Sequence, residues 1–95
     1  MPKKRQAIVV DPEDNVATAI ENLRVGARVE TERGEIILLH DIPFGHKFAL
    51  AQIPEGGYVI KYGAQIGRAV APISRGDYVH VHNVEDIVDQ VRKAG

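Results

Sequence analysis

Two histidines on one extended segment are the residues of this sequence best suited to chemistry. His80 and His82 alternate with valines in the stretch Tyr-Val-His-Val-His at positions 78–82. Side chains alternate across a strand, so Tyr78 and both histidines are expected on one face, with Val79 and Val81 on the opposite, core face. The histidines would stand roughly 7 Å apart at Cα, close enough to reach one substrate or one metal ion. Histidine suits proton transfer near neutral pH, although a solvated strand face would show the same pattern.

A metal site would need further ligands, and His40, Asp41 and His46 are the candidates. The sequence has no cysteine, which excludes disulfides and thiolate chemistry. It also has no Ser-His-Asp constellation and no glycine-rich phosphate loop. The residues therefore leave the metal unassigned and favour acid–base chemistry by histidine.

Basic side chains that could bind an anionic substrate occur in two further places. Lys47 follows His46 in the loop Pro-Phe-Gly-His-Lys at 43–47, and loops on a rigid scaffold often carry binding residues. Lys61, Tyr62 and Arg68 form a second group, and arginine can hold a carboxylate through two hydrogen bonds. An ordinary solvated surface would account for both groups as well.

Short strands are expected to position these residues. Apolar runs and alternation predict strands at 7–10, 29–31, 35–40, 58–62, 65–70 and 78–82, whereas 46–53 fits a strand or a helical turn. The run at 36–39 is expected to be buried on both faces. The core is predicted to be built from seven apolar residues, namely Ile8, Val10, Ile36, Leu38, Val59, Val79 and Val81.

Two short helices are expected to pack outside this core, which makes the predicted class mostly β with some helix (α+β). The first is predicted to begin at Asp11 as N-cap, with an apolar face on Val16, Ala19, Ile20 and Leu23. The second is predicted to begin at Asn83, with an apolar face on Val84, Ile87, Val88 and Val91, and with Arg92 and Lys93 in its last turn.

A heptapeptide recurs along the chain. Ile-Pro-Glu-Gly-Gly-Tyr-Val at 53–59 returns as Ile-Ser-Arg-Gly-Asp-Tyr-Val at 73–79, and a fainter copy, Leu-Arg-Val-Gly-Ala-Arg-Val, occupies 23–29. Each copy combines an apolar anchor, a turn that glycine permits and the start of a strand. The spacing is too irregular for a solenoid and indicates a compact β domain.

Size and charge limit the class of protein. Ninety-five residues fit one domain, 1–95, with a flexible tail expected at 1–5. Twelve Lys and Arg balance thirteen Asp and Glu, which argues against nucleic-acid or membrane binding through a basic field. The apolar runs are too short for a signal peptide or a bilayer span. We expect a cytoplasmic protein whose substrate pocket is shared with a second chain, since such pockets occupy roughly 300–1,000 Å³.

Four segments together resemble a known family. They read Asp-Asn-Val-Ala at 14–17, Ile-Pro-Phe-Gly-His-Lys at 42–47, Ile-Lys-Tyr-Gly-Ala-Gln-Ile-Gly at 60–67 and Gly-Asp-Tyr-Val-His-Val-His-Asn at 76–83. In this order and spacing they resemble the SAF-type domain of the altronate/galactarate dehydratase family, over nearly the whole chain. The resemblance implies a β-clip fold in a single domain.

The implied function is that of the small subunit of a sugar-acid dehydratase, a hydro-lyase that is inactive without a large dehydratase subunit. The implied substrates are altronate- or galactarate-like acids. The catalytic candidates are His46, His80 and His82, and the substrate-binding candidates are Lys47, Lys61, Tyr62, Arg68 and Asn83. The resemblance itself implies five recurring positions among them, namely His46, Lys61, Tyr62, His80 and His82. No cofactor is expected in the isolated chain, and a divalent iron or manganese ion could serve the assembled enzyme.

Two alternatives stay open at this point. The chain is also similar to the small subunit of (2R)-sulfolactate sulfo-lyase, in which the leaving group would be sulfite. It could instead be a non-catalytic β-clip module that binds carbohydrate or protein, since a fold does not fix a function. The isolated chain could also form a homo-oligomer.

Overall fold

The computed structural model describes residues 5–87, and these residues form nine strands and no helix. The strands are β1 (Ala7–Ile8), β2 (Val16–Ala19), β3 (Arg28–Thr31), β4 (Gly34–Ile37), β5 (Lys47–Ala49), β6 (Tyr58–Lys61), β7 (Ala64–Ala69), β8 (Tyr78–Val79) and β9 (Val84–Asp86). The expected α+β class is therefore wrong, because the described part of the chain is all-β. It includes no apolar helix of membrane-spanning length.

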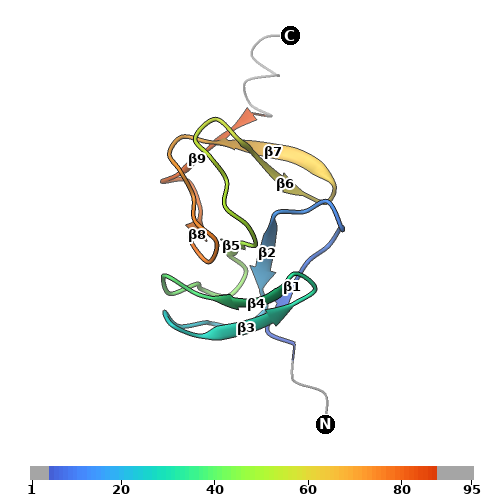
Figure 1. The fold of residues 1–95 in the computed structure, drawn as a ribbon, viewed down its shortest axis with the longest axis vertical. Coiled ribbons are helices and arrows are strands. Elements are labelled where there is room, and N and C mark those ends of the chain that lie inside the picture. Colours follow the sequence, from blue (N-terminus) through green and yellow to red (C-terminus); the bar gives the residue numbers. More distant parts are fainter. Residues whose placement is uncertain (1–4, 88–95) are drawn as a thin grey trace.

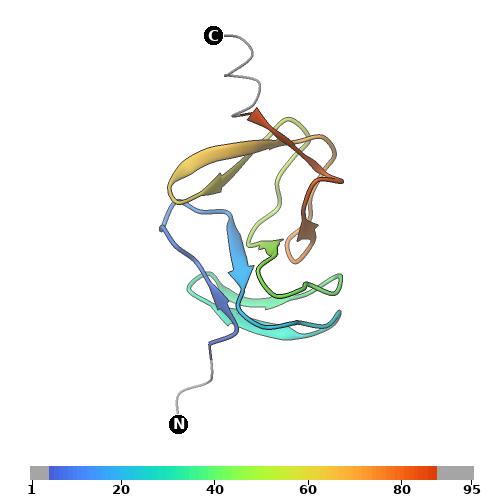
Figure 2. The ribbon, with the colours of Figure 1, turned by 180° about the vertical axis from the view of Figure 1, so that it is seen from behind.

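The strands pair antiparallel in three sheets, with the orders β1-β2-β5-β8, β3-β4 and β6-β7-β9. The β3–β4 hairpin lies at one end of the molecule and the β6-β7-β9 sheet at the other, with the four-stranded sheet between them (Figure 1). The reverse view shows β2 running between these two ends (Figure 2). This arrangement of folded hairpins is compatible with a β-clip.

A turn and a strand replace the first predicted helix. The Asp11 side chain accepts a hydrogen bond from the Glu13 N–H, and the Asp14 N–H donates to the Asp11 carbonyl, so the chain turns here. Strand β2 follows and pairs with β1 on one side and β5 on the other. Both faces of β2 are buried because Val16 packs into one apolar cluster and Ala17 and Ala19 pack into another, which produces the apolar spacing that resembles a helix.

The second predicted helix is wrong at its start, because residues 83–86 form a turn and a strand. The side chain of Asn83 donates to the Tyr78 carbonyl and accepts from the His80 N–H, closing a turn instead of capping a helix. Strand β9 then pairs with β7, joining Val84 to Ala69 in register. The helix positions Val88, Val91, Arg92 and Lys93 lie outside the described residues.

The recurring heptapeptide is a real structural unit with four copies. In each copy a backbone hydrogen bond of 2.8–3.0 Å closes a turn, and the glycine of that turn, Gly26, Gly45, Gly56 or Gly76, has φ between 83° and 90°. Glycine adopts this left-handed region without steric cost, which fits a type II turn. The copies pair two by two: Leu23 bridges to Ile42, and Ile53 bridges to Ile73.

The fourth copy is Ile-Pro-Phe-Gly-His-Lys-Phe at 42–48, most of which the sequence predicts only as a loop. Its pairing with the first copy places it in the repeat. As a result, His46 and Lys47 enter β5 in the same way that Asp77 and Tyr78 enter β8. The repeat thus places Lys47 at the start of β5 and Tyr78 at the start of the neighbouring strand β8.

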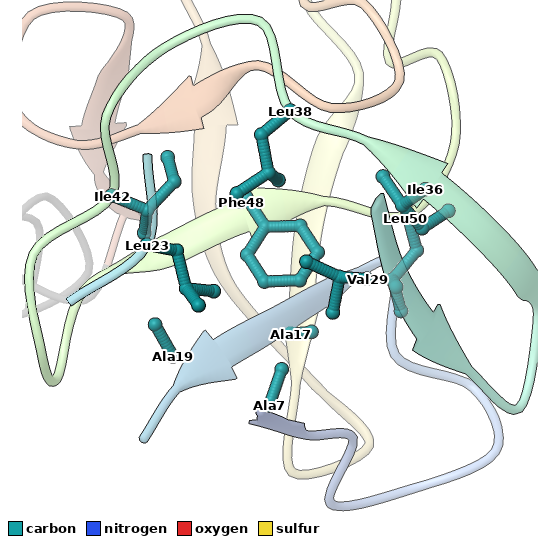
Figure 3. Packing of buried hydrophobic residues seen from close by; sticks show 10 residues of the cluster. All are labelled: Ala7, Ala17, Ala19, Leu23, Val29, Ile36, Leu38, Ile42, Phe48 and Leu50. Atoms are coloured by element: carbon teal, nitrogen blue, oxygen red, sulfur yellow. The ribbon is translucent and has the colours of Figure 1, made fainter. Parts of the chain in front are cut away.

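The core consists of two apolar clusters. The larger one surrounds the fully buried Phe48 of β5, as Figure 3 shows. The smaller one joins β2, β5 and β8 to β6 and β7 through Val16, Val59 and Val79 among others. Four predicted core residues are buried as expected: Ile36, Leu38, Val59 and Val79.

Three predicted core residues are exposed: Ile8 by 37%, Val10 by 50% and Val81 by 81%. Val81 is exposed because β8 ends at Val79, so the alternation of faces stops there. The run at 36–39 is buried on one face only, since Ile37 and Leu39 are about half exposed. Its β4 strand has a single partner, β3, at the end of the molecule.

Candidate active site

Three of the four histidines converge on one tyrosine. The Tyr78 hydroxyl lies 2.5 Å from Nδ1 of His46, and the two ring centroids are 5.6 Å apart. The ring of His80 is stacked on that of Tyr78 at 5.4 Å and lies 4.8 Å from the ring of His46. The ring of His82 lies 5.6 Å from that of Tyr78. His46, His80 and His82 therefore gather around Tyr78.

Strand pairing and a turn bring these rings together. Strands β5 and β8 pair antiparallel with Phe48 opposite Tyr78 and Lys47 opposite Val79, which sets His46 beside the end of β8, next to His80. Beyond β8 the chain turns through residues 80–83, where Asn83 bonds back to Tyr78 and His80. The expectation that His80 and His82 share the face of one extended strand is wrong. The turn, rather than strand alternation, directs them to Tyr78.

A hollow of about 240 Å³ adjoins this cluster. Lys47 and His80 supply its basic groups and Asp86 an acidic one, with the apolar lining Val59, Ile66, Val79, Val81 and Val84. These residues come from β5 and β8 on one side and from β6, β7 and β9 on the other. Ordinary substrate pockets occupy roughly 300–1,000 Å³, so this hollow could hold only part of a sugar acid.

Partial burial and nearby positive charges lower the pKa values of two groups that line the hollow, Lys47 and His80. Partial burial, and then the charge of Lys61, lower the pKa of Lys47, while Tyr62 opposes them. Partial burial lowers the pKa of His80 below 6.5, and the positive charges of His46, Lys47 and His82 add to this effect. His80 is thereby kept unprotonated near neutral pH, which is the state that a proton acceptor needs.

The β6–β7 hairpin presents Lys61 and Tyr62 at its tip. Tyr62 has φ 59° and Gly63 φ 71°, the two positive values of a type I′ turn. Tyr62 is 63% exposed, and its ring lies 4.7 Å from the Lys61 ammonium. A tyrosine in the left-handed region is costly, and such strain tends to persist at functional sites. The fully buried Asp14 accepts the Gly63 N–H and holds the turn.

Two other predicted substrate-binding residues already have partners. Arg68 makes two hydrogen bonds to the Glu85 carboxylate, at 2.8 and 2.5 Å, and this pairing raises the pKa of Arg68. Asn83 is engaged in its turn. These contacts occupy the side chains of Arg68 and Asn83, so neither is free to bind substrate beside the histidine cluster.

The remaining metal-ligand candidates serve the repeated turns. His40 Nε2 lies 3.1 Å from Asp77, and Asp41 accepts the Val25 N–H. Within residues 5–87, no three His, Asp or Glu side chains are grouped so that they could hold a metal ion. The donors of this described part therefore do not fit a metal site by themselves.

Sequence reasoning missed two residues of this site. Tyr78 was placed on the histidine face but was given no role, although it shares the spacing of His80 and His82. Asp14 was assigned to a helix start, and its burial beneath the hairpin tip depends on a partner 49 residues away. No local pattern could have revealed that contact.

A family model described as the altronate/galactarate dehydratase SAF domain matches residues 5–87. The chain belongs to this SAF-domain family. The match confirms the resemblance seen in the sequence, and it includes the histidine cluster, the hairpin tip and Asp14.

Characterised relatives contain this SAF domain as part of larger enzymes. Altronate dehydratase of Escherichia coli is 45% identical over 78 residues, which are 82% of this chain and 16% of that protein. Galactarate dehydratase (L-threo-forming) of E. coli is 40% identical over 72 residues, 76% of this chain and 14% of that protein. The (2R)-sulfolactate sulfo-lyase subunit alpha of Chromohalobacter salexigens is 52% identical over 44 residues, 46% of this chain and 47% of that protein. The chain thus spans about a sixth of the dehydratases that it matches.

Proposed function

We propose that this SAF domain acts as the small subunit of a cytoplasmic sugar-acid dehydratase and completes an active site on a separate, larger chain. The reaction is elimination of water from an altronate- or galactarate-like acid. A proton leaves the carbon next to the carboxylate, the neighbouring carbon–oxygen bond breaks, and the departing hydroxyl takes up a proton to form water. The names of the relatives support this reaction class.

The observation that carries the proposal is the convergence of His46, His80 and His82 on Tyr78, beside the half-buried Lys47. Elimination next to a carboxylate needs a proton acceptor, a proton donor and a group that stabilises the ene-diolate. The cluster offers imidazoles for proton transfer, with His80 held neutral at physiological pH. Lys47 supplies a positive charge next to it.

Substrate binding would fall to Lys47 and to the nearby hairpin tip, since neither Lys47 nor Lys61 forms an ion pair within residues 5–87. Lys47 and Lys61 would attract the substrate carboxylate, and exposed Tyr62 would contact the sugar chain. The hollow is too small to enclose a sugar acid, so the remaining walls must come from the larger chain. An iron or manganese ion of the assembled enzyme would take its ligands from that chain, because the described residues hold no ligand triad.

A second candidate function is that of the small subunit of a sulfolactate sulfo-lyase. The 52% identity to such a subunit over 44 residues favours it. In that reaction sulfite leaves in place of hydroxide, so less assistance from an acid is needed. The same proton acceptor and the same cations would serve both reactions.

Reconstitution tests the proposal. The 95-residue chain would be purified alone and with a large dehydratase-like chain of the same organism, and assayed with altronate, galactarate and sulfolactate. We expect turnover of one of these acids by the pair and none by either chain alone. Turnover by the small chain alone would refute the subunit role. Tight pairing without turnover of any of the three acids would favour a binding module.

A further inference from the structure

Tyr78 is fixed where it meets His46. Its half-buried ring packs against the larger core cluster, and the ring of His80 is stacked on it with an interplanar angle of 6°. The hydroxyl therefore has little freedom to move, and it lies 2.5 Å from Nδ1 of His46. The orientation of the His46 imidazole is consequently set by Tyr78.

The direction of this hydrogen bond decides what His46 can do. Either the hydroxyl donates to an unprotonated Nδ1, or an Nδ1–H donates to the hydroxyl oxygen. A phenol has an ordinary pKa of about 10, and the N–H of a neutral imidazole is a far weaker acid, so the hydroxyl is the better donor. With Nδ1 accepting, a neutral His46 carries its hydrogen on Nε2.

We propose that Tyr78 is a positioning residue that holds His46 in the neutral Nε2–H form, so that His46 donates a hydrogen bond to substrate and does not accept its proton. Which substrate atom accepts this hydrogen bond rests on the proposed function, which makes it an oxygen of the substrate carboxylate. As the proton leaves the carbon next to the carboxylate, negative charge develops on the carboxylate oxygens, and a fixed N–H donor stabilises it.

This arrangement separates the roles of two neighbouring histidines. His80 has no such hydroxyl bond among the described contacts, and partial burial, together with the nearby Lys47, lowers its pKa. It is the better acceptor for the substrate proton. His46, whose Nδ1 is occupied, is the better donor to the developing ene-diolate. Two like side chains thereby supply a base and an electrophile.

Nitrogen NMR of the 95-residue chain tests the first half of the proposal without any activity. Above pH 7.5 the two ring nitrogens of His46 distinguish the tautomers by their ¹⁵N resonances. We expect the wild type to show Nε2–H alone and Tyr78→Phe to show a mixture of both forms. An Nδ1–H form in the wild type overturns the proposal. A tautomer ratio unchanged by Tyr78→Phe, in a variant with an otherwise native amide spectrum, overturns it as well.

Side-chain rescue in the assembled enzyme tests the second half. Gln keeps an N–H donor close to the place of Nε2, whereas Leu does not. We expect His46→Leu to lower kcat about 100-fold, the usual effect of losing one donor to an oxyanion, and His46→Gln to restore most of it. Equal losses in both variants would show that His46 transfers a proton, and would overturn the assignment. A wild-type pair without turnover would instead refute the proposed function and leave the tautomer result standing.

Discussion

The carboxylate of Asp14 accepts a 2.9 Å hydrogen bond from the backbone N–H of Gly63, across 49 residues of sequence. Its second oxygen accepts the N–H of Asp11, and the side chain is fully buried. Gly63 belongs to the tight turn that presents Lys61 and Tyr62. A buried charge thus ties the first turn of the chain to the hairpin that we propose to bind substrate.

Replacing Asp14 should destabilise the chain. Asp14→Ala leaves two N–H groups without their acceptor, and buried groups of this kind cost about 1–3 kcal/mol each. We expect the free energy of unfolding in urea to fall by about 2–3 kcal/mol. The exposed neighbour serves as control, since Glu13→Ala should change stability by less than ~0.5 kcal/mol. Equal effects of the two substitutions would contradict the role of Asp14.

Two glycines of the repeated turn should differ in their tolerance of alanine. The Cβ that Gly26→Ala adds would have no neighbouring heavy atom within 4 Å. We therefore expect only the backbone cost of the left-handed region, about 1–2 kcal/mol. Gly76→Ala meets the same backbone cost, and its Cβ would overlap the Ile37 carbonyl oxygen. Overpacking should add about 1–3 kcal/mol. Thermal unfolding of both variants measures the difference, and a Gly76→Ala variant no less stable than Gly26→Ala would contradict the close approach.

Relief of the strain at Tyr62 should separate stability from activity. Asn-Gly is the preferred pair for a type I′ turn, so Tyr62→Asn should stabilise the chain by about 1 kcal/mol. If Tyr62 contacts substrate, KM of the assembled enzyme should rise in the same variant. The control is Tyr58→Asn, at an exposed strand position where no turn strain is relieved. A Tyr62→Asn variant that is less stable and fully active would argue against strain kept for function.

The lowered pKa of His80 should make the stability of the folded chain depend on pH. Its folded-state pKa is lowered below 6.5 by partial burial and by His46, Lys47 and His82, while Asp86 lies in the same hollow. The unfolded chain therefore binds the proton first, so stability is full above about pH 7.5 and declines as the pH falls through 6.5. We expect part of that decline to vanish in His80→Gln. A histidine NMR titration giving His80 a pKa above 6.5 would contradict this.

The sequence predicted strands more reliably than helices. The predicted strands at 29–31 and 35–40 are present as β3 and β4, which pair as a hairpin. Both helices failed because strand pairing with distant segments outweighed local spacing and capping signals. In β2, the apolar spacing comes from burial between the two core clusters, which only the assembled fold reveals.

The sequence suggested residues for the candidate site, but it did not reveal how the fold brings them together. His46, His80 and His82 do meet, yet the turn closed by Asn83, and not a strand face, brings the last two to Tyr78. Arg68 was predicted from its charge alone, and its pairing with Glu85 depends on β7 and β9 lying side by side. Contacts between segments far apart in sequence decided each of these outcomes.

The measurement that tests the central claim most directly compares two histidine variants in the assembled enzyme. His80 belongs to the histidine cluster around Tyr78. His40 lies against Asp77 instead, and among the described residues its ring contacts no ring of that cluster. Both variants should fold, as their amide NMR spectra would show. We predict that His80→Gln lowers kcat at least ~100-fold, the low end of what an acid or base contributes, while His40→Gln stays near wild type. Full turnover by His80→Gln, or equal losses in both variants, would contradict an active site built on this cluster.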